Sequence, residues 1–268
     1  MSGRLPGEPD LLRTAAFNSG YRAEARTVAR HFLDTFETSE AVVVPSGSCT
    51  AMIAHHFSEL FQKEPETLAR VHSLESRVYE FSTYLTEVAG VEDVGARLDR
   101  IVTFHDGCHG LRELGVKDAP RRLLANVRGL ELREMAPAEE CCGFGGTFAV
   151  KFPELSGAMA RTKIDAIQRT GAATVVSGDP SCLMQIQGAL SRAGSSIGTL
   201  HLARSPRQPL ILLYVHRIRT KIARGAGRRQ APVGYLHGDR AAQGEARRSG
   251  LRRCSARLSG VALARQRP

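Results

Sequence analysis

Four cysteines in three separate segments of this 268-residue chain have the chemistry of metal ligands. Cys108 lies in FHDGCHG, Cys141 and Cys142 are neighbours in EECCGFGGTF, and Cys182 lies in GDPSCLM. Thirty-two residues separate Cys108 from Cys141, and 39 separate Cys142 from Cys182. Thiolates are good ligands for zinc and for iron-sulfur clusters. A site made of these four cysteines would therefore be assembled by the fold and not by one local motif.

The adjacent pair favours a cluster with several irons over a single zinc ion. Structural zinc sites usually space their paired cysteines by two to four residues, because neighbouring sulfurs close an awkward ring on one ion. In a cluster, Cys141 and Cys142 can bind different irons. Glycines at 143, 145 and 146 follow the pair, and they allow backbone N–H groups to approach the sulfurs. We interpret this segment as the cradle of an iron-sulfur cluster.

Other interpretations of the same residues stay open. Cys141 and Cys142 could form a vicinal disulfide in a thiol-based enzyme or redox sensor. The glycines after Cys142 do not form a dinucleotide fingerprint, because the third glycine and a clear preceding strand are missing. His105 and His109 could ligate a metal or donate protons, but we interpret both as polar turn residues. No side chain is a convincing general base, so the catalytic residues are unknown.

Short apolar runs alternate with helical periodicity through residues 1–203, which indicates an α/β fold with mostly parallel sheets. We predict strands at Ala41–Val44, Ile101–Phe104, Leu130–Met135, Thr174–Ser177 and Ile197–Leu202. We predict helices at Tyr21–Phe36, Thr50–Phe61, Glu66–Val88, Ala119–Val127, Glu154–Arg169 and Leu183–Arg192.

An internal repeat divides this region into two halves. AVVVPSGSCTAM from Ala41 and TVVSGDPSCLM from Thr174 share a strand, a polar turn, Ser-Cys and the start of a helix. Two related halves that meet near residue 98 account for this similarity. Ligands collect at the carboxyl ends of strands in open α/β sheets, which is where we expect Cys49, Cys108 and Cys182.

The positive net charge of +10 comes from the C-terminal tail. Residues 204–268 hold 16 of the 37 Lys and Arg but only two of the 27 acidic residues, so residues 1–203 carry a net charge of −4. The tail has little apolar periodicity, and we expect it to be disordered. Its arginines are not interleaved with aromatic residues, so we do not expect it to bind nucleic acid.

The apolar runs are too short for a membrane span, and the amino end does not resemble a secretory signal. We therefore expect a cytoplasmic protein, in which grouped cysteines are ligands or redox groups and not disulfides.

Several motifs together resemble the lactate utilization protein A family. These are FNSGYRAEA, VVVPSGSCTAM, GVEDVGARL, HDGCHGLRELGV and ECCGFGGTFAVK, in this order between about Ala16 and Ala203. The segment CCGFGGTF, with Cys108 upstream and SCLM downstream, is similar to the cysteine-rich, or CCG, domain of iron-sulfur oxidoreductase subunits. Related families are the iron-sulfur subunit of glycolate oxidase and a subunit of heterodisulfide reductase.

The resemblance implies a fold of two cysteine-rich halves and a [4Fe-4S]-type cluster in the second half. The cluster ligands would be Cys108, Cys141, Cys142 and Cys182. The implied function is electron transfer in the oxidation of L-lactate to pyruvate, together with an iron-sulfur partner and a third subunit. The domains would be 1–98, a degenerate cysteine-rich half without CCG, then 99–203, the CCG half, and 204–268, the Arg-rich tail.

The chain departs from the family pattern at both ends. Leu11, Leu12 and Arg13 stand where the first half should have Cys-Cys-Gly, and the preceding strand and cysteine are missing. We therefore expect Cys49 to lack companions and the first half to be incomplete and without a metal. Asp179 stands where related sequences have the first cysteine of Cys-x-x-Cys, and we do not count it as a ligand. A thiol/disulfide protein of heterodisulfide reductase type and a non-functional truncated remnant are the alternatives.

Overall fold

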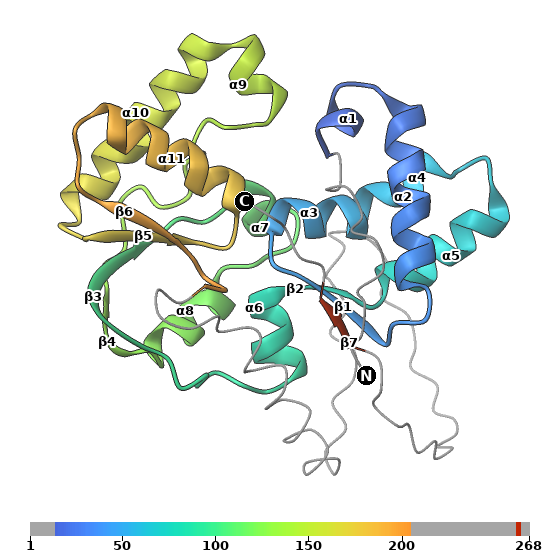
Figure 1. The fold of residues 1–268 in the computed structure, drawn as a ribbon, viewed down its shortest axis with the longest axis horizontal. Helices are drawn as coiled ribbons and strands as arrows, with labels where there is room; N and C mark the ends of the chain where they lie inside the picture. Colours follow the sequence, from blue (N-terminus) through green and yellow to red (C-terminus); the bar gives the residue numbers. More distant parts are fainter. Residues whose placement is uncertain (1–13, 205–260, 264–268) are drawn as a thin grey trace, which may run out of the picture.

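The computed structural model describes residues 14–204 and 261–263 and has an α/β fold with two parallel sheets (Figure 1). One sheet has the strand order β4-β3-β5-β6 and the other β2-β1-β7. The predicted class, two related α/β halves with parallel sheets, is confirmed. Leu11, Leu12 and Arg13, and the tail that we expected to be disordered, lie outside the described residues except for Val261–Leu263.

The second half is built around the four-stranded sheet. Its strands are β3 (Arg97–Phe104), β4 (Arg128–Leu132), β5 (Thr174–Ser177) and β6 (Gly198–His201). Its helices are α7 (Cys108–Arg112), α8 (Asp118–Ala125), α9 (Thr147–Lys151), α10 (Pro153–Arg169) and α11 (Pro180–Arg192). Neighbouring strand residues face opposite sides of a sheet, so Val175 packs against α10 and α11 while Val176 packs on the α8 side.

The first half surrounds the three-stranded sheet. Before the sheet come α1 (Thr14–Asn18) and α2 (Arg22–Phe36), followed by β1 (Ala41–Val44). Next come α3 (Gly47–Ala51), the π-helix η1 (Met52–His56), α4 (Phe57–Leu60) and α5 (Pro65–Glu75). The remaining elements are β2 (Val78–Glu80), α6 (Phe81–Thr83), the π-helix η2 (Tyr84–Val88) and β7 (Val261–Leu263).

The predicted continuous helix from Glu66 to Val88 is wrong, because a strand interrupts it. Helix α5 ends at Glu75, and β2 then pairs with β1 in parallel, Val42 lying opposite Val78. Val78 and Glu80 are buried and Tyr79 is partly buried, which suits a strand that adds to the edge of β1. Helical periodicity could not reveal this strand, since three residues are too short for a period to show.

Strand β7 gives the two sheets a common arrangement. It pairs in parallel with β1, so that Ala262 lies opposite Val42, just as Thr103 of β3 lies opposite Val175 of β5. On the other side of β1, β2 takes the place that β6 has beside β5. The internal repeat seen in the sequence therefore extends to strand direction and register.

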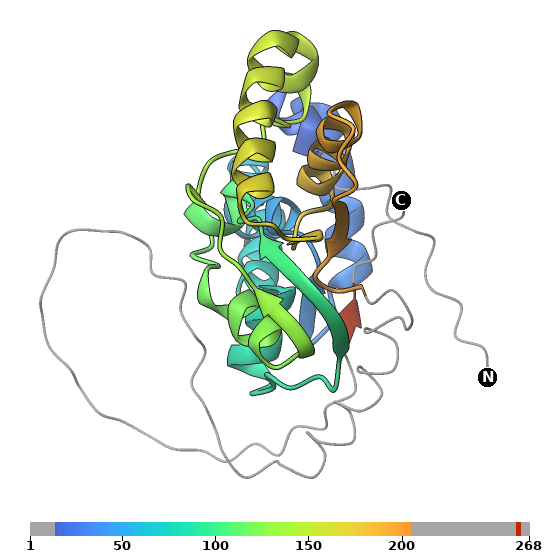
Figure 2. The ribbon, with the colours of Figure 1, turned by 90° about the vertical axis from the view of Figure 1, so that its left-hand side faces the viewer.

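Close contacts join the halves at the loops that follow the strands. Helices α3 and α7 approach so closely that a Cβ on Gly47 would lie 2.9 Å from Cα of Gly110. On α8, Leu123 packs into the first half's cluster around Val43, while Leu124 joins the second half's core. In the perpendicular view, α9 and α10 extend beyond the sheets on the side where α1 and α2 also lie (Figure 2).

Candidate metal centre

The fold brings together the four cysteines that the sequence predicts as ligands. Cys108 begins α7, Cys141 and Cys142 lie in the loop between β4 and α9, and Cys182 lies in the first turn of α11. The thiols of Cys108 and Cys142 both hydrogen-bond Cys141, and Cys142 also hydrogen-bonds Cys182. All four are thiols and not disulfides. Sulfurs from three loops therefore form one contiguous group.

His105 completes this group from the end of β3. One of its ring nitrogens and the sulfurs of Cys142 and Cys182 all lie within 4.8 Å of one another. The residue is fully buried, and neither ring nitrogen has a hydrogen-bond partner among the described residues. Burial lowers the pKa of His105 to about 3, so the imidazole is neutral. Our interpretation of His105 as a polar turn residue is wrong, because residues after a central strand are buried.

His109, the second histidine of this segment, is half-exposed. Its Nδ1 atom lies 3.5 Å from Sγ of Cys108, and its Nε2 atom lies 3.7 Å from a carboxylate oxygen of Glu113. It thus contacts the edge of the cysteine group and the surface at the same time.

Electrostatics in the metal-free site favour a thiolate at Cys141. Its sulfur accepts hydrogen bonds from the Cys108 and Cys142 thiols and from the backbone N–H of Gly143, at 3.3 Å in the last case. These donors lower the pKa of Cys141 far below the value of an ordinary thiol. The same hydrogen bonds, together with burial, raise the pKa of Cys108 and of Cys142.

The loop that carries the cysteine pair is held against α10 and α11. Gly143 has a φ of 84°, and a Cβ there would lie 2.5 Å from the carbonyl oxygen of Ser156. The Ser156 hydroxyl donates to the carbonyl of Gly143 at 2.8 Å, and the amide of Gln185 donates to that hydroxyl at 3.0 Å. The sequence predicted that glycine is needed here, and the close approach of α10 explains why.

A buried lysine lies beside the same loop. Lys163 of α10 is fully buried, and its Nζ donates to the carbonyls of Ala138 at 3.1 Å and Pro137 at 3.5 Å. Burial lowers the pKa of Lys163, while the nearby sulfurs of Cys141 and Cys142 act in the opposite direction. Sequence reasoning missed this residue, because a lysine on an amphipathic helix is normally expected to face solvent.

The loop between β3 and α7 is fixed by an ion pair. Asp106 is buried and accepts two hydrogen bonds from the guanidinium of Arg121, both at 2.9 Å. Arg121 also donates to Glu134 at 2.7 and 3.0 Å. Bidentate pairs of this kind fix geometry as well as adding energy. The pair therefore anchors the short segment that carries both His105 and Cys108.

Asp179 connects the halves. Its carboxylate accepts hydrogen bonds from the backbone N–H of Ser48 at 3.0 Å and from the hydroxyls of Ser48 and Ser46 at 3.2 and 3.5 Å. Ser181 donates to it from its own helix at 3.3 Å. Cys49 is partly buried on α3 and packs against the first half's core.

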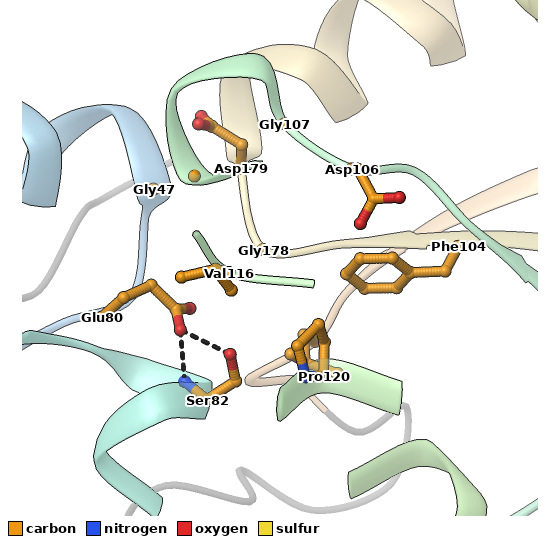
Figure 3. A pocket seen from close by; sticks show the side chains of 12 residues that line it. Gly47, Glu80, Ser82, Phe104, Asp106, Gly107, Val116, Pro120, Gly178 and Asp179 are labelled. Atoms are coloured by element: carbon orange, nitrogen blue, oxygen red, sulfur yellow. Dashed lines mark hydrogen bonds between the residues drawn. The ribbon is translucent and has the colours of Figure 1, made fainter. Parts of the chain in front are cut away.

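A small cavity lies between the halves, and its wall includes the carboxylates of Glu80, Asp106 and Asp179 (Figure 3). Glu80 accepts hydrogen bonds from the backbone N–H groups of Ser82 and Thr83, and burial raises its pKa. The volume is about 30 Å³. A water molecule needs about 10–15 Å³, so this cavity can hold water but not an organic acid.

Comparison with known proteins agrees with this geometry. The family model described as Cysteine-rich domain (CCG) matches residues 14–54 and 102–187. Lactate utilization protein A 1 of Bacillus mycoides (strain KBAB4) is 45% identical over 190 residues, which cover 70% of this chain and 77% of the relative.

Two further relatives carry the name Lactate utilization protein A. The protein of Macrococcus caseolyticus is 44% identical over 70% of this chain and 76% of the relative, and that of Bacillus cereus (strain G9842) is 40% identical over 70% and 78%. Within the described part of the chain, no helix has the length and apolar character that crossing a membrane requires.

Proposed function

Because the chain belongs to the lactate utilization protein A family, we propose that it is the iron-sulfur electron-transfer subunit of a complex that oxidises L-lactate to pyruvate. The observation that supports this most is the contiguous group of Cys108, Cys141, Cys142 and Cys182. We propose these four cysteines as the ligands of a cluster of the [4Fe-4S] type.

The residues present fit an iron-sulfur cluster. Four sulfurs converge, one of them already favoured as a thiolate, and the buried ring nitrogens of His105 have no partner in the described part of the chain. A tetrahedral zinc ion would use four donors at most and would strain the adjacent pair. Once bound, an iron-sulfur cluster supplies one-electron redox chemistry.

The surrounding residues have defined roles in this proposal. The amine of Lys163 interacts electrostatically with Cys141 and Cys142, and in its protonated form it would offset part of the charge that thiolates and inorganic sulfide bring. The N–H of Gly143 donates to the Cys141 sulfur, and such bonds to sulfur tune the reduction potential of a cluster. Arg121 keeps Asp106 and hence the Cys108 loop in place.

The exposure of the cysteines supports exchange of electrons with partner subunits. Cys142 and Cys182 are buried, while Cys108 and Cys141 are partly exposed, so one side of the group is open to a docked protein. Phe152, between α9 and α10, and Met184 of α11 are exposed apolar side chains that suit a protein contact. We propose an iron-sulfur subunit and a third subunit as these partners.

Compartment and domain limits are part of the same proposal. Thiol ligands persist best in a reducing compartment, so we place the protein in the cytoplasm. We propose 1–98 as a cysteine-rich half without a metal, 99–203 as the cluster-binding half and 204–268 as an Arg-rich tail.

The proposal is tested by anaerobic purification or reconstitution, followed by iron and sulfide analysis and EPR. We expect a cluster in folded protein, with a signal on reduction or oxidation. Folded protein that binds no iron would contradict the proposal. Thiol counting then separates the alternative, because a thiol/disulfide protein would show two thiols fewer in the metal-free chain before mild reduction.

A further inference from the structure

His105 has the surroundings of a metal ligand, although cysteine spacing alone does not point to it. Its side chain is fully buried, and neither ring nitrogen bonds another group of the described chain. Buried polar groups without hydrogen bonds are costly and rare in folded proteins. A metal that accepts the lone pair of one ring nitrogen would satisfy this imidazole.

The position of the ring indicates a metal that His105 shares with Cys142 and Cys182. A ring nitrogen lies within 4.8 Å of the sulfurs of both Cys142 and Cys182, which is the separation expected of atoms that share a metal site. The backbone N–H of His105 donates to the carbonyl of Val176 at 2.8 Å, and this bond fixes the residue at the end of β3. The imidazole is thus held rigidly next to the two most buried cysteines.

The charges around the ring also fit ligation. Lys163 of α10 lies close enough to act on the ring electrostatically. A second cation beside Lys163 would be unfavourable, whereas a neutral imidazole can give its lone pair to a metal. His109, by contrast, is half-exposed and contacts Glu113.

We propose that His105 is a nitrogen ligand to an iron atom of the cluster, beside Cys142 and Cys182. This inference rests on the proposed function, because it needs an iron-sulfur cluster at the cysteine group. It gives the site five protein donors, four sulfurs and one nitrogen. Replacing thiolate by neutral imidazole makes a cluster less negative and raises its reduction potential.

The test is pulsed EPR of the reconstituted full-length protein in its paramagnetic state, produced with natural histidine and with ¹⁵N-labelled histidine. We expect a strong nitrogen coupling that changes with the label. It should disappear in His105→Ala and persist in His109→Ala, the matched control on the other side of Cys108. A wild-type spectrum without histidine coupling, or a coupling that persists in folded His105→Ala, would overturn the inference.

A second variant covers the case in which His105→Ala does not fold. His105→Cys can keep a ligand at the same place, so we expect iron content near wild type, no histidine coupling and a lower reduction potential. A potential equal to that of wild type would count against ligation. If the proposed function itself is wrong, folded wild-type protein will bind no iron. If only the inference about His105 is wrong, the wild-type protein will bind iron without a histidine coupling.

Discussion

Cys141 is the acceptor for three hydrogen-bond donors in the metal-free protein. Interaction with the Cys108 and Cys142 thiols lowers the pKa of Cys141, as does the Gly143 N–H, which donates to its sulfur at 3.3 Å. Charge is therefore concentrated on one of four neighbouring cysteines before any metal arrives. Thiolates are both the metal ligands and the nucleophiles of cysteine chemistry, so this asymmetry can be measured.

Iodoacetamide at pH 6 should modify Cys141 first in reduced, metal-free protein. An ordinary thiol with a pKa of about 8.5 is less than about 1% ionised at this pH. Because a low pKa also weakens the nucleophile, we expect a rate advantage of about tenfold and not more than a hundredfold. Peptide mass spectrometry at short times measures it, with urea-unfolded protein as the control. Equal labelling of all four cysteines in the folded protein would contradict the assignment.

Residue types predicted the cysteine group but not its buried neighbours. Thiols with this spacing have few uses in a reducing compartment, so Cys108 and Cys182 could be selected from the sequence. The sequence does not show that β3 lies between β4 and β5, and this position is what buries His105. Lys163 was missed for the same reason, because its burial depends on the loop from Pro137 folding over α10.

The conformation of the loop between β4 and α9 depends on glycine at position 143. Gly143 combines a positive φ with a position where a Cβ would meet the Ser156 carbonyl at 2.5 Å. Gly146 has a φ of 60° but no atom within 4 Å of a Cβ. Alanine at position 146 therefore measures the free-energy cost of a positive φ alone, and alanine at position 143 measures that cost plus the cost of a steric clash.

Gly143→Ala should lower the free energy of unfolding of the metal-free protein by about 3 kcal/mol, because strain at positive φ adds to a steric overlap. It should also reduce iron bound per chain, since the loop must move away from α10. Gly146→Ala has the strained backbone but no clash, so it should cost less, about 2 kcal/mol, and keep its iron. Urea denaturation and iron analysis measure both effects. Similar losses in the two variants would show that contact with α10 does not shape the loop.

At the level of elements, long periodic segments were predicted well and short ones were not. Helices α2 and α10 lie where the sequence places them, because each buries one face. Strands β1 and β5 also lie where predicted, because each is a short β-branched run that is buried throughout. Strand β2 was taken for part of a helix, because its three residues are defined by pairing with β1. Strand β7 could not be predicted, because its pairing with β1 joins residues 220 positions apart.

In the whole molecule, one carboxylate links the two halves through three hydrogen bonds. Asp179 accepts all three from Ser46 and Ser48 of the first half, and it also accepts one from Ser181 of its own helix. In this chain the residue contributes to the interface between the halves.

Asp179→Ala should destabilise the protein by about 2 kcal/mol, because the buried Ser46 and the partly buried Ser48 lose the acceptor that they share. It should also separate the unfolding of the halves, so that fluorescence of the buried Tyr84 and circular dichroism no longer give coincident urea transitions. Ser181→Ala removes one bond within the second half and should cost about 1 kcal/mol with coincident transitions. Unchanged coincidence in folded Asp179→Ala would mean that other contacts couple the halves.

For the whole molecule, the sequence predicted the repeat but not the contacts between its two halves. Two related halves could be inferred from the matching segments around Cys49 and Cys182. The way in which they join could not, because it depends on Gly47 meeting Gly110 and on Asp179 reaching Ser48. Those contacts link residues more than 60 positions apart and leave no local pattern.

The repeat also supplies the most direct test of the central claim, that the cysteines of the second half bind an iron-sulfur cluster. Cys182 and Cys49 occupy the same place in the two halves, each in the first turn of a helix after a buried strand. Cys182→Ser and Cys49→Ser are therefore matched variants, to be reconstituted anaerobically beside wild type. Iron per folded chain should be about four in wild type and in Cys49→Ser, and well below that in Cys182→Ser. Equal iron in the two variants, or none in folded wild type, would contradict the account.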